Sequence, residues 1–380
     1  MVNKEMIPTM ICSAQEQVWD QLKQVSISEK LGSAYLFSGP PGCGKEGMAI
    51  QFAKLLNCES GKADICKNCP SCIRMKNLQH EKLKLIFPLP TPKKKQDHET
   101  GGLDIKDLDM INKAIKKKAQ DPFFKIRIPR ATRILIQSIR ELRKSLYLKS
   151  SNTGRKMVLV FDAHLLCVGQ GEAANAFLKL LEEPPDNTSI ILITDHVELL
   201  LPTIISRCQR IGFPKLNDAF IENWFKTKMV RAKDIPLLIG LSRGNFHSAQ
   251  FFISQSLDEL ILVIEDLIKS INQDDPEKWR KFIQDYSKMA KQDAEKFAFH
   301  FMLLKIWYQS ANRFQKNMEY PFYNTPLKMS IERYVKKHSS ADFPAIVFEL
   351  EDTMGAIAKN LYMPLVLGNL LLSVQKHLSS

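Results

Sequence analysis

Three short apolar runs in the first half of the chain predict buried strands. They are AYLFS (34–38), KMVLVFDAH (156–164) and SIILITD (189–195). Each run is almost continuously apolar, and the second keeps this character until Asp162. Strands of a parallel sheet have this pattern because helices cover both of their faces.

Helical patterns lie between these runs. Apolar residues recur at helical spacing from Met48 to Leu56, and a second amphipathic stretch ends at Pro184 and Pro185. Strands that alternate with helices predict an α/β fold with a doubly wound parallel sheet. In such a fold the ligand site lies at the carboxyl ends of the strands.

After about Pro214 the pattern becomes helical almost throughout. Residues 256–271, 295–314 and 344–361 carry apolar positions at helical spacing and show few of the alternations that are typical of strands. The second half of the chain is therefore predicted to be α-helical.

These patterns predict three domains. We place an α/β core at residues 1–213, a small helical domain at 214–255 and a larger helical domain at 256–380. Within the core, residues 88–130 are polar and strongly charged. Such a composition predicts a surface insertion or a partly disordered loop.

Composition is that of a globular protein. Of the 380 residues, 44% are hydrophobic and 25% are charged, which suits two or three domains. No run reaches the roughly 18 apolar residues of a membrane-spanning helix, and the first residues lack the apolar centre of a signal peptide. We therefore expect a cytoplasmic protein that does not contact a membrane.

Positive charge is concentrated in the first half of the chain. The formal net charge is +13, with basic clusters at 93–95, 116–118 and 125–133. A basic excess favours polyanions such as nucleic acid, because binding releases counterions. Lysine runs are as often solvated helix faces, so charge alone does not choose between the two interpretations.

The loop GPPGCGK (39–45) has the spacing of a phosphate-binding loop between a strand and a helix. Gly39, Gly42 and Gly44 allow backbone N–H groups to turn toward phosphates, and Lys45 would meet the β and γ phosphates. The next position requires a hydroxyl that holds magnesium, yet it is Glu46. A carboxylate can ligate magnesium, but it also repels a polyphosphate. Magnesium and ATP binding are both expected to weaken.

The second strand ends in the string FDAH. Asp162 stands where a metal-holding aspartate is expected, but the next position, which would carry the carboxylate that orients the attacking water, is Ala163. His164 follows Ala163. Because side chains alternate in direction along an extended strand, His164 would point to a different side of the strand. The chain therefore lacks an evident catalytic base.

Three strings together resemble the clamp-loader subunits of bacterial DNA polymerase III in the AAA+ superfamily, and among these the delta-prime type. The strings are GPPGCGK, FDAHLLCVGQGEAANAFLKLLEEPP (161–185) and LPTIISRC (201–208). The resemblance covers about residues 10–255 and includes a helix at 136–146. It implies an AAA+ core with an inserted zinc module, a helical lid at 214–255 and a helical collar at 256–380 for oligomerisation.

The resemblance also assigns single residues. Arg207 would be an arginine finger that reaches the ATP of a neighbouring subunit, for which a planar, permanently charged guanidinium is suited. The alternative is a surface arginine in a salt bridge. Thr194 matches the first sensor. At the second sensor, where relatives that hydrolyse ATP carry an arginine, this chain has His247.

The chain's own ATP machinery is thus altered at Glu46, Ala163 and His247, whereas Arg207 remains. This asymmetry predicts a subunit that does not hydrolyse ATP. The resemblance implies a hetero-pentamer with gamma/tau and delta subunits that opens a sliding clamp and places it on primed DNA. Two alternatives stay open: an active ATPase of the gamma/tau type that uses Glu46 as a magnesium ligand, and a zinc-dependent DNA-binding module.

Four cysteines form a C-x7-C-x2-C-x2-C pattern at Cys58, Cys66, Cys69 and Cys72. Four thiolates this close in sequence can surround a zinc ion as a tetrahedron. Disulfides are disfavoured in the cytoplasm, and an iron–sulfur cluster is the other metal-based interpretation. We predict structural Zn²⁺, because four protein ligands leave no position open for chemistry. The clamp-loader resemblance also implies a zinc module here.

Overall fold

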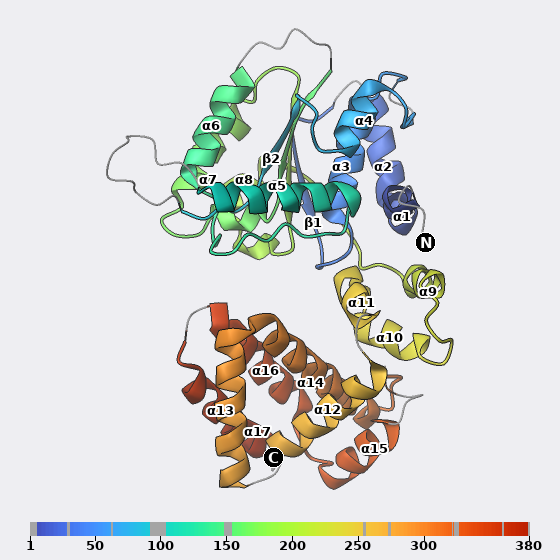
Figure 1. Cartoon of the computed structure of the whole chain (residues 1–380), viewed down its shortest axis with the longest axis vertical. Helices are drawn as coiled ribbons and strands as arrows, with labels where there is room; N and C mark the ends of the chain where they lie inside the picture. Colours follow the sequence, from blue (N-terminus) through green and yellow to red (C-terminus); the bar gives the residue numbers. More distant parts are fainter. Residues whose placement is uncertain are drawn as a thin grey trace. The chain divides into compact units, whose positions relative to one another are not determined.

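A parallel five-stranded sheet organises the first 220 residues of the computed structural model (Figure 1). Its strands are β1 (Ala34–Ser38), β2 (Leu83–Ile86), β3 (Lys156–Val160), β4 (Thr188–Thr194) and β5 (Gln209–Gly212). They lie in the order β2-β3-β4-β1-β5, with Leu36 of β1 opposite Leu192 of β4. The structure describes residues 6–28, 31–61, 64–91, 104–147, 154–253, 256–272, 275–320, 322, 327–358 and 361–378.

The predictions of the first and third strands are confirmed, whereas the second strand is shorter than predicted. It ends at Val160, because Asp162 adopts a left-handed conformation with φ of 49° and a short 3₁₀ helix, η1 (Ala163–Leu166), begins directly after it. Strands β2 and β5 were not predicted. Both have only four residues and lie at the two edges of the sheet, so neither shows a long apolar run.

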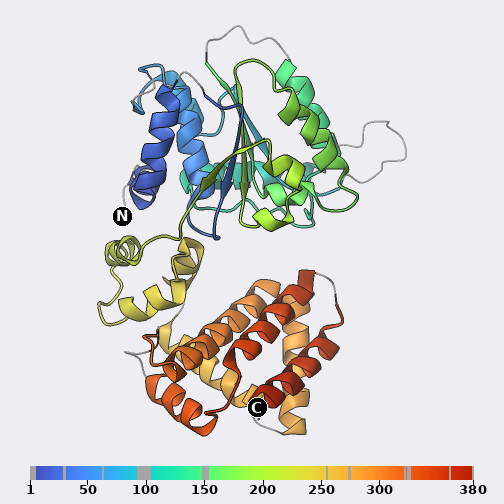
Figure 2. The same cartoon turned by 180° about the vertical axis from the view of Figure 1, so that it is seen from behind.

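The two faces of the sheet carry different helices (Figures 1 and 2). Side chains alternate along a strand, and Leu36, Val158 and Ile190 belong to one core cluster with apolar residues of α6 (Ile136–Tyr147) and α7 (Glu172–Glu182). The ring of Tyr35 points to the opposite face. There it packs edge-to-face against Phe52 of α3 (Lys45–Leu56), with ring centroids 5.7 Å apart.

Further helices surround this core. They are α1 (Met6–Ala14), α2 (Glu16–Ile27), α4 (Pro70–Lys76), α5 (Ile105–Gln120) and α8 (Pro202–Ile205), with a second 3₁₀ helix, η2 (Val197–Leu199). Helix α5 falls within the segment predicted to be a surface insertion or a partly disordered loop. Residues 104–130 form a helix and a loop beside the phosphate-binding loop, so the second alternative does not describe them, and the surface insertion stays a prediction. Residues 92–103 lie outside the described part of the chain.

The second compact unit comprises residues 221–243 and 248–380. The helices after the sheet are α9 (Asp218–Thr227), α10 (Ile235–Ser242), α11 (Phe246–Ile253), α12 (Leu257–Asn272), α13 (Pro276–Gln292), α14 (Ala294–Gln315), α15 (Leu327–Lys337), α16 (Phe343–Ala358) and α17 (Met363–Leu378). Helix α14 packs against α12, α13, α15 and α16, and its Phe301 and Trp307 are fully buried.

The predicted helical character of the second half is confirmed, including the three long helices. The boundaries at residues 213 and 255, and the names lid and collar, stay predictions. Across the described residues, none of the helices combines the length and apolar character that a membrane span requires.

Candidate nucleotide site and metal centre

The phosphate-binding loop keeps the backbone shape that its glycines predict. Gly42 has φ of +70°, and a Cβ atom there would lie 1.9 Å from Oδ1 of Asn245. Gly44, with φ of +93°, is the N-cap of α3. Both positions therefore require glycine, because a side chain would be strained at this φ and, at residue 42, would clash. The loop leads from β1 into α3, as predicted.

Lys45 does not project into open space. Its Nζ donates to the carbonyl oxygens of Gly39 and Pro40, both at 2.7 Å, and lies 2.6 Å from Oδ1 of Asp195. An ammonium group has three N–H donors, and each has an acceptor here. In a nucleotide-bound loop this lysine meets phosphates. Asp195 takes that place in this structure.

Glu46 has a buried partner. Nζ of Lys118, at the end of α5, forms an ion pair with Oε2 of Glu46 and also donates to the carbonyl oxygens of Pro122 (2.8 Å) and Phe124 (2.6 Å). The Lys118 side chain is fully buried. The position that normally presents a hydroxyl to magnesium is thus committed to a lysine of the same chain.

A third lysine joins two carboxylates. Nζ of Lys125 lies 2.8 Å from Oδ1 of Asp162 and 2.9 Å from Oδ2 of Asp195. Burial opposes the charge on Lys125, but Asp162 and Asp195 outweigh it and raise the pKa of the ammonium. Burial likewise opposes the charge of Asp195, but Lys125 and Lys45 lower the pKa of its carboxyl to about 2. Each charge stabilises the other.

Burial lowers the pKa of two histidines near the site, His164 and His247. Nδ1 of His164 lies 3.0 Å from Oγ1 of Thr194, so the expectation that His164 would point elsewhere is wrong. The reason is that β3 ends before this residue, and strand alternation no longer applies. Nε2 of His247 donates to the carbonyl oxygen of Phe123 at 2.6 Å.

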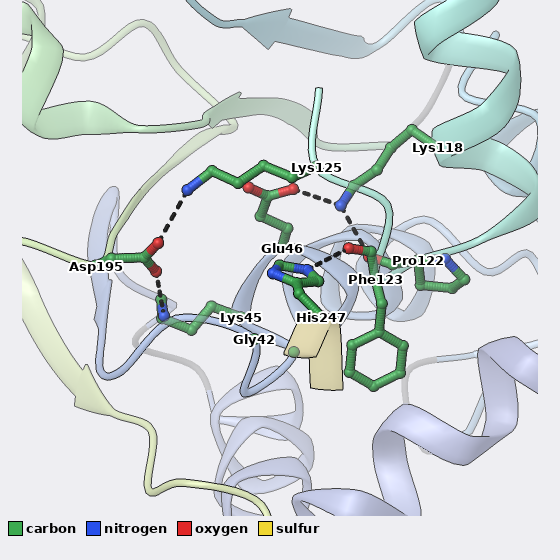
Figure 3. A pocket seen from close by; sticks show the side chains of 10 residues that line it. Gly42, Lys45, Glu46, Lys118, Pro122, Phe123, Lys125, Asp195 and His247 are labelled. Carbon is green, nitrogen blue, oxygen red and sulfur yellow. Dashed lines mark hydrogen bonds and ion pairs between the residues drawn. The ribbon is translucent and has the colours of Figure 1, made fainter. Parts of the chain in front are cut away.

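Figure 3 shows the side chains that line one pocket of this site. Its lining residues are Gly42, Gly44, Lys45, Glu46, Lys118, Pro122, Phe123, Lys125, Asp195 and His247. The volume left is about 20 Å³, little more than one water molecule needs. Pockets for ligands of drug size measure about 300–1,000 Å³. Ala163 is fully buried beside the site and offers no base.

Replacement of Asp195 by asparagine tests this charge cluster through pH. The folded-state pKa of Asp195 is about 2, below the ordinary 3.8, so its stabilisation is present above pH 3.8 and lost as pH falls through 2. The shift corresponds to about 2 kcal/mol. We expect Asp195→Asn to lower the free energy of unfolding at pH 7 by at least this amount, and the difference to vanish near pH 2.

Chemical denaturation from pH 7 to pH 2 measures this difference. Asp109→Asn is the matched control, because Asp109 pairs with Lys113 on the surface of α5. Equal pH dependence of the Asp195 variant and the unmodified protein would contradict the assigned pairing.

Arg207 lies outside this pocket. Nη2 of Arg207 lies 2.8 Å from Oε1 of Glu182 and Nη1 donates to the carbonyl oxygen of Thr203 at 3.0 Å. The arginine side chain is 37% exposed. The salt bridge is therefore a weak surface pair, which contributes about 0–1 kcal/mol. Within one chain the guanidinium is available at the surface, and the finger role stays a prediction.

The four predicted cysteines come together. Their sulfur atoms all lie within 4.8 Å of one another, and Sγ of Cys66 is 3.9 Å from Sγ of Cys72. Zn–S bonds of about 2.3 Å in a tetrahedron place sulfurs about 3.8 Å apart. Backbone N–H groups donate to three of the sulfurs, on Cys58, Cys66 and Cys69. The donor set fits a metal ion, and structural zinc is consistent with it.

Five residues of the site were not predicted from the sequence: Lys118, Pro122, Phe123, Lys125 and Asp195. A signal for Lys118 exists in the helical phase of α5. Asp107, Ala114 and Lys118 are spaced as one face of a helix and are all buried. The basic run at 116–118 is thus not a uniformly solvated face. No comparable signal marks Lys125, because its partners are distant in sequence.

Comparisons with known proteins assign a family to the chain. The family model described as "DNA polymerase III, delta subunit" matches residues 14–217. The delta′ subunit of Bacillus subtilis is 32% identical over 195 residues, which are 51% of this chain and 46% of that protein. The tau subunit of B. subtilis is 30% identical over 208 residues, 54% of this chain and 29% of that protein. The delta′ subunit of Pseudomonas aeruginosa is 27% identical over 263 residues, 68% of this chain and 66% of that protein.

The chain thus spans less than half of the length of the two B. subtilis relatives that it matches. Because these relatives include both delta′ and tau, the comparisons do not separate the two subunit types. The family match, in contrast, covers more than half of this chain and includes the phosphate-binding loop, the cysteine cluster and Arg207. The chain therefore belongs to the DNA polymerase III delta-subunit family.

Proposed function

We propose that this chain is a delta-prime-type subunit of the clamp loader that does not hydrolyse ATP. The observation that carries the proposal is the occupied phosphate site. Lys45 is held by Asp195 and two carbonyl groups of its own loop, and only about 20 Å³ remains beside it. Hydrolysis also needs a carboxylate that orients water, and Ala163 cannot act in this way.

We propose that the chain contributes Arg207 to the ATP site of a neighbouring subunit. Arg207 is exposed and is held by a weak surface pair with Glu182 and by the carbonyl oxygen of Thr203. It can therefore exchange Glu182 for phosphate oxygens of an adjacent subunit. The proposed partners are gamma/tau and delta subunits in a cytoplasmic hetero-pentamer, with the sliding clamp and primed DNA reached through the complex. The helical residues 256–380 are the proposed collar.

ATP turnover by the purified chain tests the proposal. We expect a rate no higher than that of Lys45→Ala, because the loop lysine of the unmodified chain is already paired. Lysine-dependent turnover would instead assign the chain to the gamma/tau type, with Glu46 as a magnesium ligand. Co-purification with gamma/tau and delta subunits tests membership separately, and failure to assemble would contradict the proposed role.

A further inference from the structure

One segment supplies much of the material that fills the phosphate site. The closing segment, residues 104–130, consists of α5 and the loop after it and contributes four lining residues: Lys118, Pro122, Phe123 and Lys125. It lies between β2 and β3 in sequence. The phosphate-binding loop and the strand and helix on either side of it, β1 and α3, contain no residue of the closing segment.

The closing segment is held by an internal ion pair and by contacts with Phe246 and His247. Nη2 of Arg130 lies 2.9 Å from Oδ1 of Asp107, which ties the end of the segment to its helix. The Phe123 ring lies against Phe246 with centroids 4.0 Å apart, and its carbonyl accepts from His247. These contacts hold the backbone next to the phosphate-binding loop, so the two lysines have defined positions.

Lys118 behaves as a built-in counterion. A buried ammonium is costly unless its donors are all satisfied and a negative charge is adjacent. Glu46 and the carbonyls of Pro122 and Phe124 provide three acceptors. The lysine and the glutamate are 72 residues apart in sequence. Neither would be stable here without the other.

Lys125 balances the remaining acidic groups. It lies between Asp162 and Asp195, where a cation is needed to offset two adjacent carboxylates. Lys45, Lys118 and Lys125 together match Glu46, Asp162 and Asp195 in charge. The six groups carry no net charge, so they offer neither an excess of positive charge to a polyphosphate nor an open carboxylate to magnesium.

We propose that the closing segment is an internal occupant of the nucleotide site, in which Lys118 and Lys125 replace the positive charge of a metal ion and exclude Mg²⁺-nucleoside triphosphates. This inference rests on the proposed function and goes further, because a subunit that does not hydrolyse ATP can still bind it. The closing segment, and not only the altered loop, keeps nucleotide out.

Binding of a fluorescent ATP analogue with Mg²⁺ to the full chain tests the inference. The variant Glu46→Thr/Lys118→Ala/Lys125→Ala restores the hydroxyl and removes both internal cations while Lys45 remains. We expect no saturable binding by the unmodified chain up to about 1 mM, and at least about tenfold tighter binding by the triple variant. Lys113→Ala/Lys116→Ala removes two exposed lysines of the same helix and is expected to bind no better than the unmodified chain.

The unmodified chain can be examined without substitution. Lysine acylation should modify Lys113 and Lys116 but spare Lys118, with or without about 1 mM Mg²⁺-ATP. Mass spectrometry measures which lysines are modified. ATP-dependent labelling of Lys118 would overturn the inference, as would a folded triple variant that gains no binding. Binding without hydrolysis that depends on Lys45 contradicts only this inference, whereas turnover contradicts the proposed function.

Discussion

Replacement of Arg207 by alanine is expected to lower ATP turnover and clamp loading by the assembled clamp loader. An arginine finger stabilises the charge that develops on the transferred phosphoryl group, and its loss reduces the rate by about 10³-fold or more in other systems. Only one ATP site of the assembly would meet Arg207, so the whole complex should lose less. The isolated chain should stay folded, because the pair with Glu182 is exposed and contributes about 0–1 kcal/mol.

DNA-stimulated ATPase assays on the reconstituted complex measure this effect. Arg207→Lys should not restore the full rate, because a point charge cannot reproduce the planar fork of a guanidinium. Glu182→Ala is the matched control, since it breaks the same salt bridge but leaves the guanidinium in place. Unchanged ATPase and loading rates in the Arg207→Ala complex would show that the salt bridge with Glu182 is the whole role of this arginine.

Loss of the metal is expected to have the second large effect. Zinc binding by small Cys-based modules is worth about 10–16 kcal/mol and is coupled to folding. We expect one zinc per chain, and loss of that zinc in Cys66→Ser and Cys69→Ser. Without zinc the residues around Cys58 and Cys72 should lose protection from hydrogen exchange, while the sheet keeps it.

Elemental analysis of protein purified under reducing conditions measures the metal directly. Cys167→Ser is the matched control, because Cys167 lies outside the cluster and should leave the zinc content unchanged. Iron in place of zinc would favour the alternative of an iron–sulfur cluster. If protein purified without any chelator contains no metal, the prediction of a metal centre is contradicted.

Local sequence patterns were sufficient to predict those features of the structure whose determining residues are close together in the chain. The run AYLFS, the glycines of the loop and the apolar phase of α3 predict a strand, a turn and a helix, because each depends on residues within one or two turns. The cysteine cluster is equally local, since all four ligands fall within fifteen residues. Its spacing predicted the convergence that the structure shows.

The sequence by itself thus determined the α/β class, the phosphate-loop shape, the cysteine cluster and the loss of the groups that hydrolysis needs. Only the tertiary structure decided what occupies the site. Lys118 meets Glu46 across 72 residues and Lys125 meets Asp195 across 70, and no periodicity links positions so far apart. Burial then decides their chemistry, because a lysine on a charged, polar segment is stable inside a protein only where the fold brings a carboxylate to it.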